Sequence, residues 1–100
     1  MQSYYPQAFE RDMACTEAEW LAWLPAAMGD HAWRQDGNVV SAQLEGDGHV
    51  RIEWKILPPR TIALMRLPRM GVTFEFTDTD ESARYSFMRR FDLTTQRGGG

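Results

Sequence analysis

Polar and hydrophobic residues alternate along several stretches of the chain, and the alternation is cleanest over residues 49–56. This period of two predicts a strand in a sheet that has one solvated face. The apolar side of that strand consists of Val50, Ile52, Trp54 and Ile56. Less regular patterns predict further strands over residues 8–15, where Arg11 interrupts the apolar side, and over 31–35, 38–45, 61–67 and 72–77.

Turn-forming residues separate these strands. Asp36-Gly37-Asn38 lies between two alternating runs, as expected for a β-hairpin, and Gly46-Asp47-Gly48 forms a second turn. Because proline interrupts a strand's hydrogen bonding, Leu57-Pro58-Pro59 is expected to end the strand over 49–56. Pro68-Arg69-Met70-Gly71 is then expected to turn the chain once more.

A helix is predicted to start at Thr16, because Thr16 and Glu19 have the spacing of a capping box. Cys15 and Trp20 flank this start and could form a hydrophobic staple. Pro25 is expected to kink the helix or force a restart, and Gly29 is a natural stop.

The pattern predicts a second helix after residue 77. Asp78 and Glu81 have the spacing of a second capping box, and the helix is expected to end near Phe91–Leu93. The arginines at 84, 89 and 90 are expected to lie off its buried stripe. That stripe consists of Ala83, Phe87, Met88 and Phe91.

The order of these elements predicts an α+β fold: a strand, a kinked helix, an antiparallel meander of about five strands and a C-terminal helix. Both helices are expected on one face of the sheet, because the other face is solvated. The order resembles the TATA-binding-protein-like sheet and a shortened helix-grip fold, a likeness that carries no function. Residues 1–93 are expected to form one domain, with residues 94–100 as a flexible tail.

Composition limits the cellular compartment and the classes of partner that we expect. The chain has 100 residues, 43% of them hydrophobic, and a net charge of −3, which argues against generic nucleic-acid binding. Cys15 is the only cysteine, so no disulfide can form within the chain and a reducing compartment is expected. No signal-peptide pattern and no apolar run near the about 20 residues of a membrane helix is present. A cytoplasmic protein without a membrane partner is expected.

Arginines supply one candidate site. The meander is expected to gather several of them at one end of the domain, where they could bind a phosphate or carboxylate. The alternative is a solvated, helix-terminal cluster, in which the arginines offset the helix dipole and form surface ion pairs. The residues of the candidate anion site are Arg66, Arg69, Arg89, Arg90 and Arg97.

The stretch 61–67 is apolar on both sides except at Arg66. Such a strand is either covered on both faces or presents a contact surface, and a homodimer through that surface is expected. The residues of this candidate interface are Ala63, Met65 and Leu67.

No pattern of catalytic residues is evident, and neither histidine has the spacing of a zinc ligand, so no cofactor or metal is expected. A reactive Cys15 is the alternative to a buried one, and tryptophans lining an apolar ligand cavity are the alternative to a tryptophan core. The sequence therefore favours a non-enzymatic domain that binds a protein partner or itself. A module that binds a small ligand is the second possibility.

Overall fold

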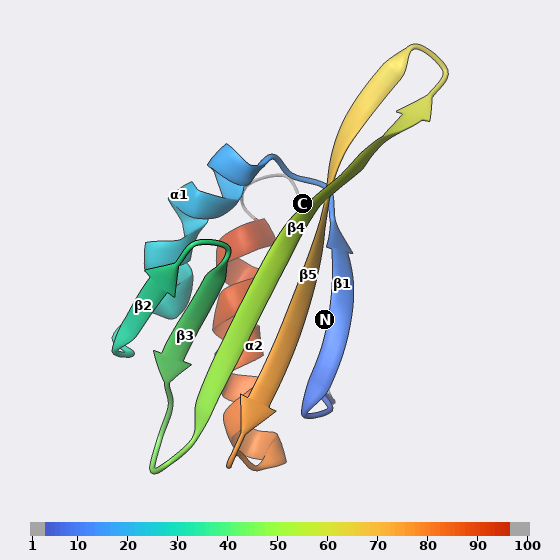
Figure 1. Cartoon of the computed structure of the whole chain (residues 1–100). Helices are drawn as coiled ribbons and strands as arrows, with labels where there is room; N and C mark the ends of the chain where they lie inside the picture. Colours follow the sequence, from blue (N-terminus) through green and yellow to red (C-terminus); the bar gives the residue numbers. More distant parts are fainter. Residues whose placement is uncertain (1–3, 97–100) are drawn as a thin grey trace.

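The computed structural model describes residues 4–96, in which two helices lie against one face of a five-stranded antiparallel sheet (Figure 1). The predicted α+β class is confirmed. Its likeness to the TATA-binding-protein-like sheet or to the helix-grip fold stays a prediction. The elements are β1 (Ala8–Met13), α1 (Glu17–Met28), β2 (Trp33–Asp36), β3 (Val39–Gln43), β4 (His49–Ile62), β5 (Met65–Thr77) and α2 (Glu81–Gln96).

The strands are arranged in the order β1-β5-β4-β3-β2, so the first strand pairs with the last one. Strands β2 to β5 form a meander of consecutive antiparallel pairs, and the predicted turns at 36–38 and 46–48 join three of them. Gly37 and Gly46 both have a φ near +60°, which a glycine adopts without strain. β1 closes the other side of the sheet against β5.

The core lies between the sheet and the two helices. Trp20 of α1 packs on Trp54 of β4 with ring centroids 5.4 Å apart, and Phe91 of α2 meets Phe74 of β5 edge to face at 5.2 Å. Trp23 and Trp33 are partly buried against the same cluster. The four tryptophans therefore pack as core residues, which was the favoured interpretation of the sequence.

Helix α1 begins as the sequence predicts. The Thr16 hydroxyl accepts a hydrogen bond from the Glu19 amide at 3.1 Å, while the Glu19 carboxylate accepts one from the Thr16 amide at 2.9 Å. Pro25 lies inside the helix, which continues through it to Met28. Gly29 follows with a φ of 61° and donates its amide to the Pro25 carbonyl.

Helix α2 differs from the prediction at both ends. Its first turn is capped by Asp80, whose carboxylate accepts the Ala83 amide at 2.8 Å, whereas Asp78 lies before the helix with a φ of 54°. The helix continues past Leu93 to Gln96, because Thr95 lies one turn beyond Phe91 on the same stripe and is also buried. Residues 94–96 are therefore helical, and residues 97–100 of the predicted tail lie outside the described residues.

The largest correction concerns the prolines. β4 and β5 form one long hairpin whose turn is Ala63-Leu64, and neither Pro58-Pro59 nor the stretch 68–71 turns the chain. The ladder shifts register between Leu57 and Arg60, so Pro58 and Pro59 both face the region of Pro68. The bulge tolerates these prolines because its ladder hydrogen bonds are already interrupted. The expected separate strand over 61–67 thus consists of the end of β4, the turn and the start of β5.

Neither described helix is long and apolar enough to cross a membrane. Residues 4–96 also contain no group of three or more histidine, cysteine or acidic side chains placed to hold a metal ion.

Candidate interaction surface

The outer part of the β4–β5 hairpin extends beyond the rest of the sheet (Figure 1). We call residues 57–69 the projecting hairpin. β1 pairs with β5 only as far as Met70, and β3 pairs with β4 only over residues 49–53, so the described strands leave both edges of the projecting hairpin open. At about 3.3 Å per residue, its six residues on β4 span roughly 20 Å.

The projecting hairpin carries large apolar side chains in contact with water. Leu64, at the turn, is 102% exposed relative to its reference value, Met65 is 62% exposed and Ile62 is 52% exposed. Ile56, just below, is 61% exposed. A two-stranded ribbon has no buried layer of its own, so these side chains lack the packing that the body of the sheet receives from the helices.

Side-chain direction divides the projecting hairpin into two faces. Ile62 pairs with Met65 and Arg60 pairs with Leu67, and each cross-strand pair shares a face. Alternation along β5 puts Met65 and Leu67 on the face that continues into Gly71 and Thr73, on the side of the sheet without helices. Four apolar residues therefore lie on this face of the hairpin: Leu57, Ile62, Met65 and Leu67.

The projecting hairpin is also cationic. Residues 57–69 contain Arg60, Arg66 and Arg69 and no acidic residue, whereas the whole chain has a net charge of −3. Arg69 donates to the Asp12 carboxylate at 2.7 Å, which ties the base of the hairpin to β1. Arg60 and Arg66 are exposed and form no ion pair within residues 4–96. Both guanidinium groups are therefore available to an anionic partner.

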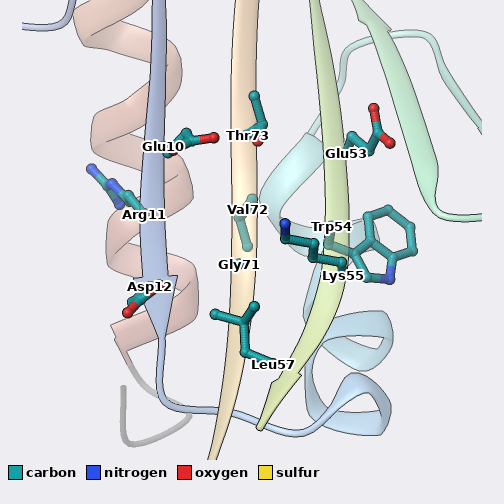
Figure 2. Close-up of a pocket in the computed structure, with 10 residues that line it drawn as sticks. All are labelled: Glu10, Arg11, Asp12, Glu53, Trp54, Lys55, Leu57, Gly71, Val72 and Thr73. Carbon is teal, nitrogen blue, oxygen red and sulfur yellow. The ribbon is translucent and has the colours of Figure 1, made fainter.

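A groove of about 390 Å³ lies on the helix-free face, where the hairpin joins the sheet. Gly71 leaves the floor of this groove without a side chain, and Leu57 leans over it from β4. Figure 2 shows Glu10 and Lys55 directed toward β5 from the two neighbouring strands. The rim carries the carboxylates of Glu10, Asp12 and Glu53 and the ammonium of Lys55. Asp12 is paired with Arg69, and Glu53 is paired with Arg51.

The predicted anion-site residues lie on different elements. Arg66 and Arg69 are on β5, where Arg69 is engaged by Asp12, and Arg89 is exposed on α2. Arg90 donates to the Ala26 carbonyl at 3.2 Å and lies against Gly29, so it joins the two helices. Within residues 4–96 no two of these side chains share a hydrogen-bond or ion-pair partner, and Arg97 lies outside that range.

The predicted interface residues all belong to the projecting hairpin. Ala63 occupies the first position of the turn with a φ of 53°, Met65 is exposed and Leu67 is half-buried. Alternation had placed the three together on one strand, whereas Ala63 in fact belongs to the turn. Sequence reasoning missed that the predicted interface continues onto Ile62 and Leu64. Those residues were assigned to the opposite side of a strand that does not exist.

An ion pair on the helix side explains the arginine that interrupts the first strand. Arg11 donates to Asp92 of α2 through its two terminal guanidinium nitrogens, and the Tyr5 hydroxyl donates to the same carboxylate at 2.9 Å. Its guanidinium also lies over the rings of Tyr5, Phe9 and Phe74, each within 5.8 Å of the ring centroid. Burial lowers the pKa of Arg11, but the hydrogen bond and charge of Asp92 raise it above the ordinary value overall.

Cys15 is a buried core residue. Burial raises the pKa of its thiol, and the negative charge of Glu19 raises it further. Both effects oppose formation of the reactive thiolate, although the residue stands before a helix N-terminus.

No family model matches the chain, and no curated protein matches its sequence significantly.

Proposed function

We propose that this protein is a non-enzymatic interaction domain whose contact element is the projecting hairpin. The observation that carries the proposal is the group of exposed apolar side chains on a ribbon that extends from the sheet. Single exposed apolar residues are ordinary, but a contiguous group of them marks contact sites. The partner is a protein, including a second copy of the chain, and the single cysteine supports a cytoplasmic location.

Burial of this group would contribute a substantial part of the free energy of a specific contact. Transfer of a fully exposed leucine, isoleucine or methionine out of water contributes about 1.5–3 kcal/mol each. Leu64 is fully exposed, and Ile62 and Met65 are exposed by about half, so the three together offer roughly 3–6 kcal/mol. This is the energy of a small hot spot at the centre of an interface.

The backbone edges of the hairpin are not the contact. Pro58 and Pro59 on β4 and Pro68 on β5 remove amide donors from both open edges. Natural sheets use edge prolines to prevent addition of a further strand. The partner is therefore expected to bind the apolar face and the tip of the hairpin.

Site-specific photo-crosslinking in cells tests the proposal. A photoreactive amino acid replaces Leu64 at the hairpin tip, and in a matched control it replaces Asn38 in the exposed β2–β3 turn. We expect a discrete protein adduct from position 64 that position 38 does not give. Equal adducts from both positions, or none from either, would contradict the proposal.

A small anionic ligand is the second candidate. It is supported by Arg66 and Arg89, which are exposed and form no ion pair among the described residues. Thermal unfolding in phosphate, against chloride at matched ionic strength, tests it. A stabilisation that Arg89→Ala removes would favour the ligand. Equal midpoints would leave the hairpin as the candidate site.

A further inference from the structure

We propose that two copies of this chain pair through the outer edge of β2, so that their sheets join into one continuous antiparallel sheet. The inference is carried by an open strand edge whose two charges, unpaired within residues 4–96, are complementary to a second copy of the same edge. It goes beyond the proposed function, because β3 separates β2 from the two strands of the projecting hairpin.

The backbone of β2 leaves hydrogen-bonding groups at this edge. β2 is last in the strand order, and no strand of residues 4–96 pairs with its outer side. The Ala32 carbonyl accepts the Gln43 amide at 2.8 Å, so every second residue from Ala32 bonds to β3. Trp33 and Gln35 therefore direct their backbone amides and carbonyls outward. The Gln35 side chain donates to the Gly37 carbonyl at 3.0 Å, which leaves the Gln35 backbone groups available.

Two opposite charges stand on the same strand. Arg34 and Asp36 are exposed, and neither forms an ion pair within the described part of the chain. Because they are two positions apart, both side chains lie on the same face of β2. A second copy that runs antiparallel to β2 can therefore present an anion to the cation and a cation to the anion.

One register satisfies both charges. A two-fold axis perpendicular to the sheet at Gln35 pairs this residue with its own copy, and the two backbones exchange two hydrogen bonds. The same axis places Arg34 of each copy opposite Asp36 of the other, at a non-hydrogen-bonded position where cross-strand side chains are closest. A pair centred on Arg34 would put two guanidinium groups opposite one another, and a pair centred on Asp36 would do the same with two carboxylates.

Helix α1 adds an exposed apolar flank. Residues 20–29 contain no charged residue, although a surface helix ordinarily has a polar outer face. Arg90 of α2 donates to the Ala26 carbonyl, which marks the flank of α1 that faces α2. Leu21 and Pro25 are exposed on a different side of the helix, away from the sheet and away from that contact.

This apolar flank of α1 faces the open edge. The Arg11–Asp92 pair holds α2 against β1, whereas α1 lies behind β2 at the opposite side of the sheet (Figure 1). Because the two-fold axis is perpendicular to the sheet, the helices of both copies lie on the same face. The two α1 helices therefore meet across the axis and cover Leu21, which is 39% exposed in the single chain.

The dimer is expected to be weak. β2 has four residues, so its contact is smaller than the about 20–30 residues on each side of a standard interface. Association in the micromolar range or weaker is therefore expected. Salt should weaken it further, because the Arg34–Asp36 pairs are exposed at the surface.

Sedimentation velocity of the full chain over a concentration series, up to about 1 mM, measures the association. We expect Arg34→Asp and Asp36→Arg each to weaken the wild-type dimer by about tenfold, because each variant places like charges across the axis. The double variant Arg34→Asp/Asp36→Arg should dimerise as the wild type does, because its pairs are exchanged and not lost. Arg89→Asp is the control for net charge, since Arg89 is exposed on α2 and forms no ion pair among the described residues.

A mixture of the two single variants tests the pairing directly. Arg34→Asp chains and Asp36→Arg chains should form a mixed dimer more tightly than either forms with itself, because both cross-axis pairs are then opposite in charge. A wild-type protein that is monomeric at every concentration would overturn the inference. Single variants that dimerise as strongly as the wild type would overturn it as well.

Disulfide trapping tests the register. Gln35→Cys should form a disulfide between two identical chains, because directly paired residues lie about 5.5 Å apart at Cα, within the reach of a disulfide. Asn38→Cys is the control, since Asn38 is exposed in the next turn, beyond the paired residues, and roughly 20 Å from its own copy. The native Cys15 is buried. Equal trapping of the two variants, or no trapping of either, would overturn the edge pairing.

The proposed function and this inference can fail separately. A dimer that depends on Arg34 and Asp36, together with no adduct at position 64 in cells, supports the edge pairing and overturns the hairpin as contact element. A monomer whose position 64 forms an adduct with a different protein supports the interaction domain and overturns the edge pairing.

Discussion

Removal of the charge at Asp92 should destabilise the domain strongly, although this residue lies far from the proposed contact surface. In Asp92→Asn the Arg11 guanidinium remains between β1 and α2 without its anionic partner. Breaking a fully buried pair costs about 3–5 kcal/mol. The Arg11 and Asp92 side chains retain 23% and 14% exposure, so we expect a loss of about 2–3 kcal/mol. For a domain of this size that corresponds to a midpoint lower by roughly 10–20 °C.

Thermal and urea unfolding followed by tryptophan fluorescence measure this loss, because Trp20 packs against Phe91 of α2. Arg51→Met is the control: Arg51 pairs with Glu53 and Glu75 on the exposed face, and its midpoint should match the wild type. The double variant Arg11→Met/Asp92→Leu should regain most of the loss, because no unpaired charge remains. An Asp92→Asn midpoint equal to the wild type would refute the reasoning and show that water solvates the pair.

Three further predictions concern single residues. Gly29→Ala should lower the free energy of chemical unfolding by about 1–3 kcal/mol, because Gly29 has a φ of 61° and a Cβ there would lie 2.6 Å from the Arg90 Nε. Adding Arg90→Ala should relieve the clash but not the backbone strain. Cys15 should react slowly with a thiol reagent at neutral pH and rapidly in denaturant; fast reaction of the native protein would contradict its burial. Burial and the Asp92 hydrogen bond raise the pKa of Tyr5 above 10.0. The unfolded chain therefore releases the Tyr5 proton at a lower pH than the folded protein does. The contribution of Tyr5 to the free energy of unfolding is complete below pH 10 and is lost as the pH rises above it. Wild-type stability should therefore fall faster above that pH than that of Tyr5→Phe, and equal slopes would contradict the assignment.

Local patterns predicted most of the fold. The capping box at Thr16 and Glu19, the two glycine turns and the strand over 49–56 depend on neighbouring residues, whose preferences act over a few positions. The Asp80 cap could have been found by the same reasoning, because Asp80 directly precedes the first helical residue. The choice of Asp78 followed a capping-box spacing that Asp80 lacks.

The prolines were misinterpreted because their effect depends on what faces them. Pro58-Pro59 alone indicates the end of a strand. Only the partner strand shows that Pro68 lies near them across a bulge, where few ladder hydrogen bonds are lost. No signal within either segment reports this pairing. The length of the hairpin could therefore not be predicted from local sequence patterns. The same holds for the candidate interaction surface, which depends on that length.

The partners of the buried arginines were likewise not predictable from the local sequence. Arg84 was expected off the buried stripe of α2, but it is 8% exposed and donates to the carbonyls of Tyr5 and Thr79. Arg11 interrupts an apolar pattern for a comparable reason, since its partner lies 81 positions away. An arginine on an apolar face indicates that some acceptor must lie opposite it, but the sequence does not name that acceptor.

The most direct test of the hairpin as contact element is the accessibility of a thiol at its tip. Leu64→Cys should react rapidly in dilute purified protein, where the tip is fully exposed and the native Cys15 is buried. In intact cells, at the natural concentration of the protein, we predict a several-fold slower reaction at position 64. The control Asn38→Cys should react at the same rate in both settings. Equal rates at position 64 in both settings would show that nothing covers the projecting hairpin, and would contradict the account.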